Sequence, residues 1–402
     1  MKRRIYALLT ILPVCILMYA SCKGNSSKTD ETAKSNDEMT QATDTAQAIK
    51  PKMQVVFLLD ATGSMSGLIG TAKEKIWSIA GSLTQTEPEP DLEIGMIFYR
   101  DRGDDFVTKH IPLGKDLDNM YEQLMAMQAN GGGDAPESVN QAIHEGINQI
   151  QWDTDPKTYR AIFLVGDCPP HMDYRDDVKY PESCIEANKK NIIINTILMG
   201  NDSEAMRIWK DIAKKTNGEF IQTDMSVNNI SINTPYDDKI NDLQYQLDQT
   251  RIYYGKSADK MVTKQAQSEK LNKEAGSSIN ARRSEYNMSK SGKKAYYGSY
   301  ELINDVMGGK KIADIPSSDL PENMQKMSTT ERQEYVDKLI EKRINLEKEI
   351  IGLNKQRQEY LDNEVAKMDA SEVEQSFDDV IYKSMKEQAA SKDIILEEKV
   401  KR

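Results

Sequence analysis

The chain has 402 residues, a length that allows two or three domains and ample buried core. Its 64 Asp and Glu residues outnumber its 53 Lys and Arg residues, and the resulting net charge of −11 argues against a nucleic-acid partner held through its phosphates. Apolar residues at 38% and charged residues at 29% are typical of a globular part accompanied by long exposed helices.

The N-terminus has the features of a secretory signal. Residues 1–4 are basic, and residues 5–20 form an apolar run that is shorter than the roughly 20 residues of a membrane-spanning helix. Small residues before Cys22 resemble the lipobox of bacterial lipoproteins, in which the chain is cut before the cysteine and diacylglycerol is attached to its thiol. We expect residues 1–21 to be a lipoprotein signal peptide and Cys22 to be lipidated. An ordinary signal peptide with an incidental cysteine is the alternative.

Residues 22–50 are rich in Ser, Thr, Asp, Asn, Gln and Lys and contain almost no branched aliphatic residue. Such a segment cannot bury enough surface to fold, so we expect a flexible tether behind the lipidated cysteine. The protein is then expected in the bacterial cell envelope, with the outer membrane favoured and the periplasmic or surface face left open. Contact with the membrane is expected through the lipid anchor only.

Strands and helices alternate between residues 53 and about 225. The segment 55–59 is apolar on both faces, as a central parallel strand requires. Lys109, His110 and Pro112 mark another of the strands as an edge strand. The alternation predicts a doubly wound, mostly parallel α/β sheet in a domain at residues 51–233. The further strands are predicted at 92–99, 106–113, 161–165, 192–198 and 219–222, and the helices at 68–83, 115–129, 137–150 and 203–216.

Residues 234–402 are predicted to form an α-helical, coiled-coil-like domain. Ser328 and Glu331 form a capping box that opens a long helix, and residues 369–372 look like the start of a terminal helix. Within the long helix Leu339, Leu346, Leu353 and Tyr360 recur every seven residues. Because Arg343 and Arg357 interrupt the companion positions, a bundle folded back on itself is favoured over a dimeric coiled coil.

The first strand runs into a turn rich in oxygen donors. Asp60, Thr62 and Ser64 stand at alternate positions and place a carboxylate and two hydroxyls on one side of the turn. Hard oxygen donors of this kind suit Mg²⁺ or a similar cation. The alternative is that Thr62 or Ser64 only caps the following helix.

Two further turns are expected at the same edge of the sheet. Asp167 directly follows the strand at 161–165, and a Gly-rich loop at 130–137 contains Asp134 and Glu137. The structural alternative is that Asp134 and Glu137 form a capping box for the next helix.

These three segments, in this order, resemble the von Willebrand factor A family and its metal-ion-dependent adhesion site. The resemblance implies that Asp60, Thr62, Ser64 and Asp167 bind a divalent cation, with Thr62 in place of the family's serine. The middle loop resembles that of the integrin β subunit, which implies Glu137 as the remaining ligand. By the same resemblance Asp101 and Asp134 would line a second cation site beside the first. The implied cofactor is Mg²⁺, with Mn²⁺ or Ca²⁺ open, and the implied partner is a protein whose acidic side chain completes the coordination.

Two of the four cysteines, Cys168 and Cys184, remain after loss of the signal peptide and acylation of Cys22. In an oxidising compartment they can form a disulfide or stay as two thiols, and the sequence favours neither.

Catalysis is not expected. The segment 63–67 resembles a nucleophile elbow, but Met65 stands where the serine is required, and no zinc-protease, phosphate-loop or dinucleotide motif occurs. Two alternatives to ion-mediated protein binding remain. The first is an envelope scaffold that acts through residues 234–402. The second is a metal-dependent hydrolase or phosphotransferase, for which His171 is the candidate general base.

Overall fold

The computed structural model describes residues 51–66, 69, 77, 79–83, 89–133, 135–223, 232–368 and 377–396. The expected signal peptide, Cys22 and the tether lie outside these residues, as do Asp134 and the expected helix start at 369–372. Residues 49–402 form one compact unit. Among the helices that the structure describes, none combines the length and the apolar composition needed to cross a bilayer.

Six strands form one sheet in the order β3-β2-β1-β4-β5-β6. Neighbouring strands are parallel except β2 and β3, which are antiparallel. The predicted doubly wound, mostly parallel sheet is therefore confirmed, and β3 is an edge strand as its Lys, His and Pro residues indicated. The strands are β1 (Lys52–Asp60), β2 (Asp91–Tyr99), β3 (Thr108–Gly114), β4 (Tyr159–Gly166), β5 (Ile193–Met199) and β6 (Phe220–Thr223).

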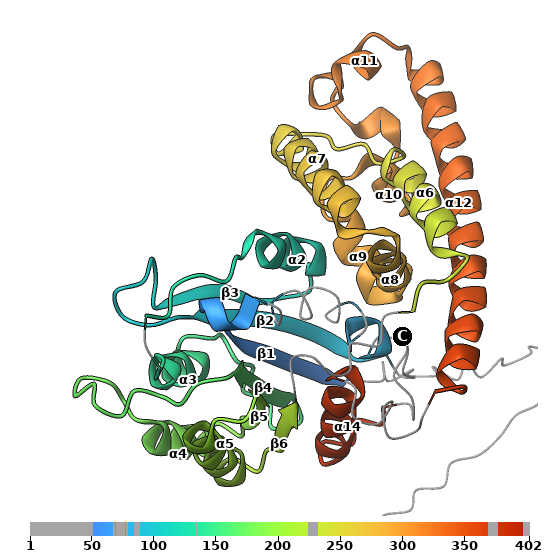
Figure 1. Ribbon diagram of the computed structural model, residues 1–402. Helices are drawn as coiled ribbons and strands as arrows, with labels where there is room; N and C mark the ends of the chain where they lie inside the picture. The colour runs from blue at the N-terminus through green and yellow to red at the C-terminus, as the bar shows by residue number, and fades with distance from the viewer. Residues whose placement is uncertain are drawn as a thin grey trace, which may run out of the picture. The chain divides into compact units, whose positions relative to one another are not determined.

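Both faces of the sheet are covered by helices because its strands are apolar on both faces (Figure 1). Val56 and Leu58 point to the face covered by α3 (Val139–Asn148), α4 (Tyr180–Lys189) and α5 (Ser203–Lys215). Alternate residues such as Phe57 point to the opposite face, which is covered by α2 (Leu117–Ala126). The helix predicted after the first strand lies mostly outside the described residues, but Ile79 and Leu83 from it are buried against this second face.

The last described helix, α14 (Phe377–Ala390), returns to the sheet. Ile381, Tyr382 and Met385 belong to the same apolar cluster as the sheet face that carries Phe57. Gln388 accepts a hydrogen bond from Tyr159 of β4 at 2.8 Å and donates one to Asn195 of β5 at 2.6 Å. The end of the chain therefore completes the core of the sheet, although more than 140 residues separate it from the last strand.

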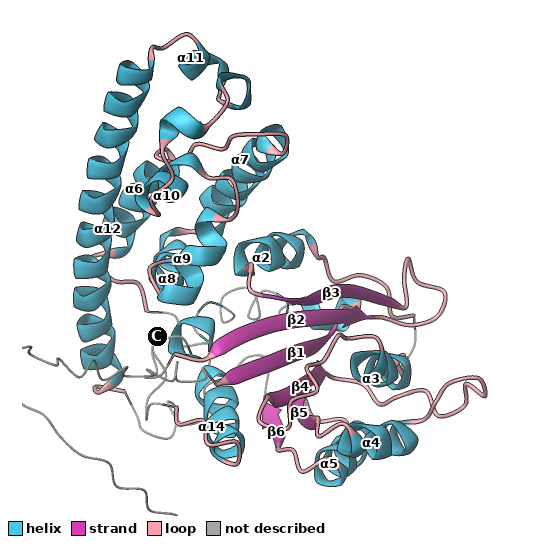
Figure 2. Cartoon of the chain, turned by 180° about the vertical axis from the view of Figure 1, so that it is seen from behind, coloured by secondary structure: helices cyan, strands magenta, loops and turns pink. Residues whose placement is uncertain are grey.

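Between the sheet and α14 the described chain is helical (Figure 2). The long helix α12 begins with the predicted capping box, in which Ser328 Oγ accepts from the Glu331 N–H and Glu331 accepts from the Ser328 N–H. Leu346 and Leu353 of α12 are buried against α6 and α8, so this helix packs within its own chain. The helices are α6 (Asp237–Asp248), α7 (Ala258–Ala275), α8 (Ser277–Asn287), α9 (Lys290–Tyr297), α10 (Leu302–Met307), α11 (Glu322–Gln325) and α12 (Thr329–Val365).

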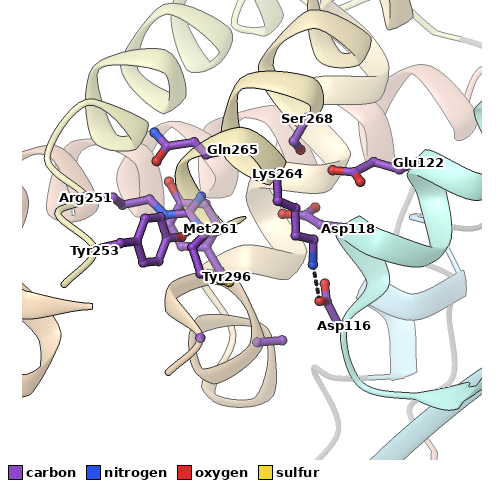
Figure 3. A pocket seen from close by; sticks show the side chains of 12 residues that line it. Asp116, Asp118, Glu122, Arg251, Tyr253, Met261, Lys264, Gln265, Ser268 and Tyr296 are labelled. Atoms are coloured by element: carbon purple, nitrogen blue, oxygen red, sulfur yellow. Dashed lines mark hydrogen bonds and ion pairs between the residues drawn. The ribbon is translucent and has the colours of Figure 1, made fainter. Parts of the chain in front are cut away.

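Charged groups join this helical region to α2. Arg283 of α8, which is 2% exposed, donates two hydrogen bonds to the carboxylate of Asp118 at 2.7 and 2.8 Å. Lys264 of α7 forms an ion pair with Asp116 at 2.5 Å, drawn as a dashed line in Figure 3. Figure 3 also shows Glu122 of α2 pointing toward Lys264 and Ser268 across a small cavity. Fixed charges therefore position α2 against α7 and α8.

The ion pair between Asp118 and Arg283 should make the free energy of unfolding depend on pH in the acid range. Burial alone would raise the pKa of Asp118, but Arg283, with Arg251 and Lys264, outweighs it and lowers this pKa. A carboxylate with a lowered pKa stabilises the fold above its unfolded pKa of about 4, and this contribution is lost as the pH falls through the lowered value. We expect Asp118→Asn to reduce the free energy of unfolding by about 2 kcal/mol at pH 7 and by much less near pH 3. Urea unfolding at both pH values measures this, and an equal loss at both would contradict it.

Candidate metal centre

The candidate cation ligands follow strand ends that are neighbours in the sheet. Leu59 of β1 pairs with Val165 of β4, and Asp60 pairs with Tyr99 of β2. The chain winds outward from β1 in one direction through β2 and β3 and in the other through β4, β5 and β6, so the strand order reverses between β1 and β4. Crevices form at such reversals, at the carboxyl ends of parallel strands. Asp60 and Asp167 therefore lie at the edge where an α/β sheet commonly binds its ligands.

The turn after β1 holds its oxygen donors close together. Thr62 Oγ1 donates to Asp60 Oδ1 at 2.6 Å and lies 3.1 Å from Ser64 Oγ. The backbone N–H of Thr62 also donates to Asp60 Oδ1, at 2.8 Å. A short 3₁₀ helix, Gly63–Met65, follows, and the Thr62 side chain makes no capping hydrogen bond to it. Thr62 therefore does not cap this 3₁₀ helix; capping of the helix predicted at 68–83 by Thr62 or Ser64 stays the alternative, because most of that helix lies outside the described residues.

Glu137 is held in place by the turn that carries Asp167. The Glu137 N–H donates to the Pro169 carbonyl at 2.9 Å, and the His171 N–H donates to the Glu137 carbonyl at 3.0 Å. Helix α3 begins only at Val139, with Ser138 as its N-cap. Glu137 therefore precedes the helix and cannot be the third residue of a capping box, so the structural alternative for this side chain does not hold.

Backbone contacts bring the Gly-rich loop onto the first turn. The Gly63 N–H donates to the Gly131 carbonyl at 3.1 Å. A Cβ atom at Gly132, whose φ is +74°, would lie 3.0 Å from both Glu137 Oε1 and Thr62 Cβ. The side chains of Glu137 and Thr62 therefore meet at this glycine. A residue with a side chain would be strained there and would press against both.

The turn after β4 approaches Asp60 just as closely. A Cβ atom at Gly166 would collide with the Tyr99 hydroxyl and lie 3.1 Å from Asp60 Oδ2. Tyr99 is fully buried, and its hydroxyl donates to the Val165 carbonyl at 3.1 Å. The absence of a side chain at Gly166 thus lets Tyr99 hold the end of β4 next to Asp60, from which the chain continues into Asp167.

The carboxylates at this edge are buried, and their charge is not balanced. Asp60 is 0% exposed and Glu137 is 2% exposed. Burial, together with the neighbouring Asp167, raises the pKa of Asp60 to about 7, even though hydrogen bonds from Thr62 act in the opposite direction. Burial and then the charges of Asp60, Asp101 and Asp104 raise the pKa of Glu137 to about 9. Buried acids with raised pKa values require either protons or a nearby positive charge.

Each of the three acids also has a buried oxygen atom without a hydrogen-bond partner among the described residues: Asp60 Oδ2, Glu137 Oε2 and Asp167 Oδ1. Buried polar atoms are nearly always satisfied, so these three oxygen atoms require a donor or a cation beyond the described residues. Oxygen-only donors with two hydroxyls fit a hard divalent cation. Within the described ranges, no three or more His, Cys, Asp or Glu side chains are grouped so that they could hold a metal ion. A cation at this edge would also use the hydroxyls of Thr62 and Ser64.

The expected second cation site remains a prediction, because Asp134 lies outside the described residues. Asp101 is 4% exposed and already accepts hydrogen bonds on both carboxylate oxygens, from Ser138 Oγ and from the Tyr174 hydroxyl, each at 2.8 Å. His171 lies beside it, with Nε2 3.4 Å from Asp101 Oδ2, and its ring stacks on Tyr174. Asp101 and His171 thus support the loops around the site.

Sequence reasoning missed two residues that brace the site. Arg100 donates from Nε to the Ala61 carbonyl at 3.0 Å and from Nη2 to the Gln128 carbonyl at 2.7 Å, which joins the first turn to the Gly-rich loop. Asn140, fully buried in α3, donates to the His171 carbonyl at 2.7 Å and accepts from the Tyr180 N–H at 2.8 Å. Arg100 could have been found by its place directly after a strand, whereas nothing local distinguishes Asn140.

Among the described residues, Cys168 and Cys184 are free thiols, so the disulfide that the sequence allowed is not formed between them. Burial raises the pKa of Cys184 to about 12. A thiol with so high a pKa is unreactive at neutral pH.

Comparisons with known proteins agree with this geometry for part of the chain. Residues 54–225 match the family model of the von Willebrand factor A domain. An ariadne-like RING finger protein of Acanthamoeba polyphaga mimivirus is 25% identical over 119 residues, which are 30% of this chain and 11% of that protein. This chain therefore spans only about a tenth of that relative's length.

Solved structures also resemble part of the chain. The VWA domain of SpRpn10 is 13% identical with a TM-score of 0.34, and the match covers 43% of this chain and 88% of that domain. The pilus adhesin SpaC from Lactobacillus rhamnosus GG, in its open conformation, is 15% identical with a TM-score of 0.34, and the match covers 44% of this chain and 28% of the adhesin.

Proposed function

From the von Willebrand factor A domain at residues 54–225, we propose that this chain is a cell-envelope lipoprotein that binds a partner protein through a divalent cation. Asp60, Thr62, Ser64, Glu137 and Asp167 would hold the cation. When bound, the cation would supply a positive charge and an open coordination position for an oxygen of the partner's Asp or Glu. The basic and apolar N-terminus and the residues before Cys22 support the envelope placement.

The observation that carries the proposal is that the buried Asp60 and Glu137 and the half-buried Asp167 each have a buried carboxylate oxygen without a hydrogen-bond partner among the described residues. They come from three turns that are distant in sequence and are held together by backbone hydrogen bonds. A cluster of buried acids without a compensating charge is costly for a fold. Its presence is explained if the cluster binds a cation.

The charge balance favours binding of an acidic partner over turnover. Three carboxylates against a charge of +2 leave the loaded site slightly negative, and the hydroxyls of Thr62 and Ser64 add donors without adding charge. A cation ligated partly by neutral oxygens keeps affinity for one more anionic oxygen. It also screens the repulsion that a partner's carboxylate would otherwise meet in a protein of net charge −11.

The experiment compares the purified chain and its Asp60→Ala variant in capturing envelope proteins, with Mg²⁺ and with chelator. We expect capture in Mg²⁺ and a loss of at least about tenfold in chelator or with Asp60→Ala, since both remove the cation. Titration calorimetry with Mg²⁺, Mn²⁺ and Ca²⁺ measures cation uptake directly and identifies the preferred ion.

Glu182→Ala is the control, because Glu182 is an exposed acid of α4 outside the turns that carry the candidate ligands. Its removal is expected to leave cation uptake and capture unchanged. No uptake of any of the three ions by the unmodified chain would overturn the proposal. Capture that persists in chelator and in Asp60→Ala would favour the scaffold that acts through residues 234–402.

A further inference from the structure

The loop between β4 and α4 carries one candidate cation ligand and is bonded to the backbone of another. Residues 167–179 form this loop and contain no helix or strand. Asp167 is its first residue, and backbone groups of Pro169 and His171 are hydrogen-bonded to those of Glu137. Because a loop lacks the hydrogen-bond ladder of a helix or strand, its position depends largely on side-chain contacts.

Three stacked side chains hold this loop. The Tyr174 ring lies parallel to the His171 ring, with 4.0 Å between the ring centres and 9° between the planes. The guanidinium carbon of Arg102 lies 4.1 Å from the centre of the Tyr174 ring. Two groups this close to one ring centre cannot share a face, so Tyr174 lies between His171 and Arg102.

Arg102 comes from the turn after β2, and its side chain crosses to the loop after β4. Its Nη1 donates to Asp176 at 2.9 Å and its Nη2 donates to Asp177 at 2.5 Å. From the same turn, Asp101 accepts a hydrogen bond from the Tyr174 hydroxyl at 2.8 Å. One stacking contact, two ion pairs and one hydrogen bond therefore join the two segments.

We propose that Arg102 is a positioning residue for the cation site, which holds the loop of residues 167–179 and thereby keeps Asp167 and Glu137 at the spacing that the structure shows. Without Arg102 the loop would have more conformational freedom, and cation binding would have to order it. The inference rests on the proposed function, because it concerns the affinity of the same site for its cation.

The charge of Arg102 makes the expected sign distinctive. Removal of a positive charge near a cation site ordinarily tightens cation binding, because it removes electrostatic repulsion. Arg102→Met would also leave the carboxylates of Asp176 and Asp177 without their ion pairs, which adds attraction for a cation. Weaker cation binding by this variant would therefore come from the loss of position and not from the change in charge.

The test is titration calorimetry of the full chain with Mg²⁺. We expect Arg102→Met to weaken Mg²⁺ binding about fivefold, which corresponds to the ordering of one or two side chains. Arg102→Lys keeps the charge and can form one ion pair, so it should weaken binding only about twofold. Tyr174→Phe changes no charge at neutral pH and keeps the ring, but it loses the hydrogen bond to Asp101 and should weaken binding about threefold.

Urea unfolding in chelator separates positioning from a general loss of stability. The Arg102 side chain is 35% accessible and its ion pairs lie at the surface, so the urea midpoint of Arg102→Met should shift by less than about 0.3 M. Arg175→Met is the matched control. Arg175 is an exposed arginine of the same loop without an ion pair to a described residue, so its removal should leave Mg²⁺ binding unchanged or slightly tighter.

The outcomes distinguish this inference from the proposed function. If the wild type takes up no cation, both are wrong. If the wild type binds Mg²⁺ and Arg102→Met binds it equally or more tightly, as Arg175→Met should, only the positioning role of Arg102 is wrong. Equal weakening by Arg102→Met and Arg175→Met would also contradict it.

Discussion

Replacement of Glu137 by glutamine is expected to reverse the order of stability between the variant and the wild type when a divalent cation is added. In chelator at pH 7.5 the wild type buries a carboxyl whose pKa is raised to about 9 by burial and by neighbouring acids. A raised pKa means that the carboxyl costs stability as the pH rises above its unfolded value. Glutamine has the same shape and no charge, so Glu137→Gln should raise the free energy of unfolding in chelator by about 2 kcal/mol.

Saturating cation should act mainly on the wild type. A ligand present at a hundred times its dissociation constant stabilises the folded state by about 2.7 kcal/mol. The variant has lost one carboxylate ligand, and it should gain little at the same concentration of Mg²⁺. Urea unfolding of both proteins, with chelator and with Mg²⁺, measures the four values. An unchanged order of stability in the two conditions would contradict the assignment of Glu137 as a ligand.

Glu145, in the helix α3 that follows Glu137, provides a matched control. It is 8% exposed, accepts from Gln141 at 2.9 Å and pairs with His110 at 2.6 Å. Burial would raise its pKa, but Thr108, Gln141 and His110 outweigh burial and lower it. Glu145→Gln should therefore destabilise the chain equally with and without Mg²⁺, in contrast to Glu137→Gln. Comparison of Glu137→Gln with Glu145→Gln therefore separates the effect of losing a cation ligand from the general effect of removing a buried charge.

The strands and the donor-rich turns could be predicted because their signals are local. Residues 55–59 are apolar on both faces, and the alternation of strands and helices predicts the doubly wound, mostly parallel sheet that the structure shows. Helix α4 was missed for an equally local reason. Its buried stripe contains Ser183, Cys184 and Ala187, which are too small and too weakly apolar to stand out, and Pro181 lies in its first turn.

Features that depend on distant partners could not be predicted. The capping-box alternative for Glu137 fails only because its backbone bonds to Pro169 and His171, more than 30 residues further along the chain. The packing of α14 on the sheet likewise depends on side chains of strands that lie more than 150 residues earlier. Arg343 and Arg357 interrupt the heptad pattern of the long helix, and no local pattern indicates that both are buried in ion pairs with acids distant in sequence.

Replacement of Arg343 by methionine is expected to lower the free energy of unfolding more than any other single substitution proposed in the helical region. Arg343 and Glu301 are both 0% exposed and are joined by two hydrogen bonds, at 2.8 and 3.1 Å. Arg343 also donates to the side chain and the carbonyl of Thr250. Arg343→Met would leave the Glu301 carboxylate buried without its counter-charge, which typically costs about 3–5 kcal/mol. Urea unfolding measures the loss, and Lys342→Met, an exposed neighbour, should change stability by less than about 0.5 kcal/mol.

A second substitution tests whether the unpaired charge causes the loss. Glu301 also accepts hydrogen bonds from the N–H groups of Ile252 and Asn304, at 2.8 and 2.7 Å, so a residue with one remaining acceptor is preferable to an apolar one. Arg343→Met combined with Glu301→Gln removes the buried negative charge and should recover about half of the lost stability. If the double variant is as unstable as the sum of the single variants, the loss comes from packing around the methylene chain of Arg343. Recovery would instead show that the loss in Arg343→Met comes from the buried Glu301 carboxylate left without its counter-charge.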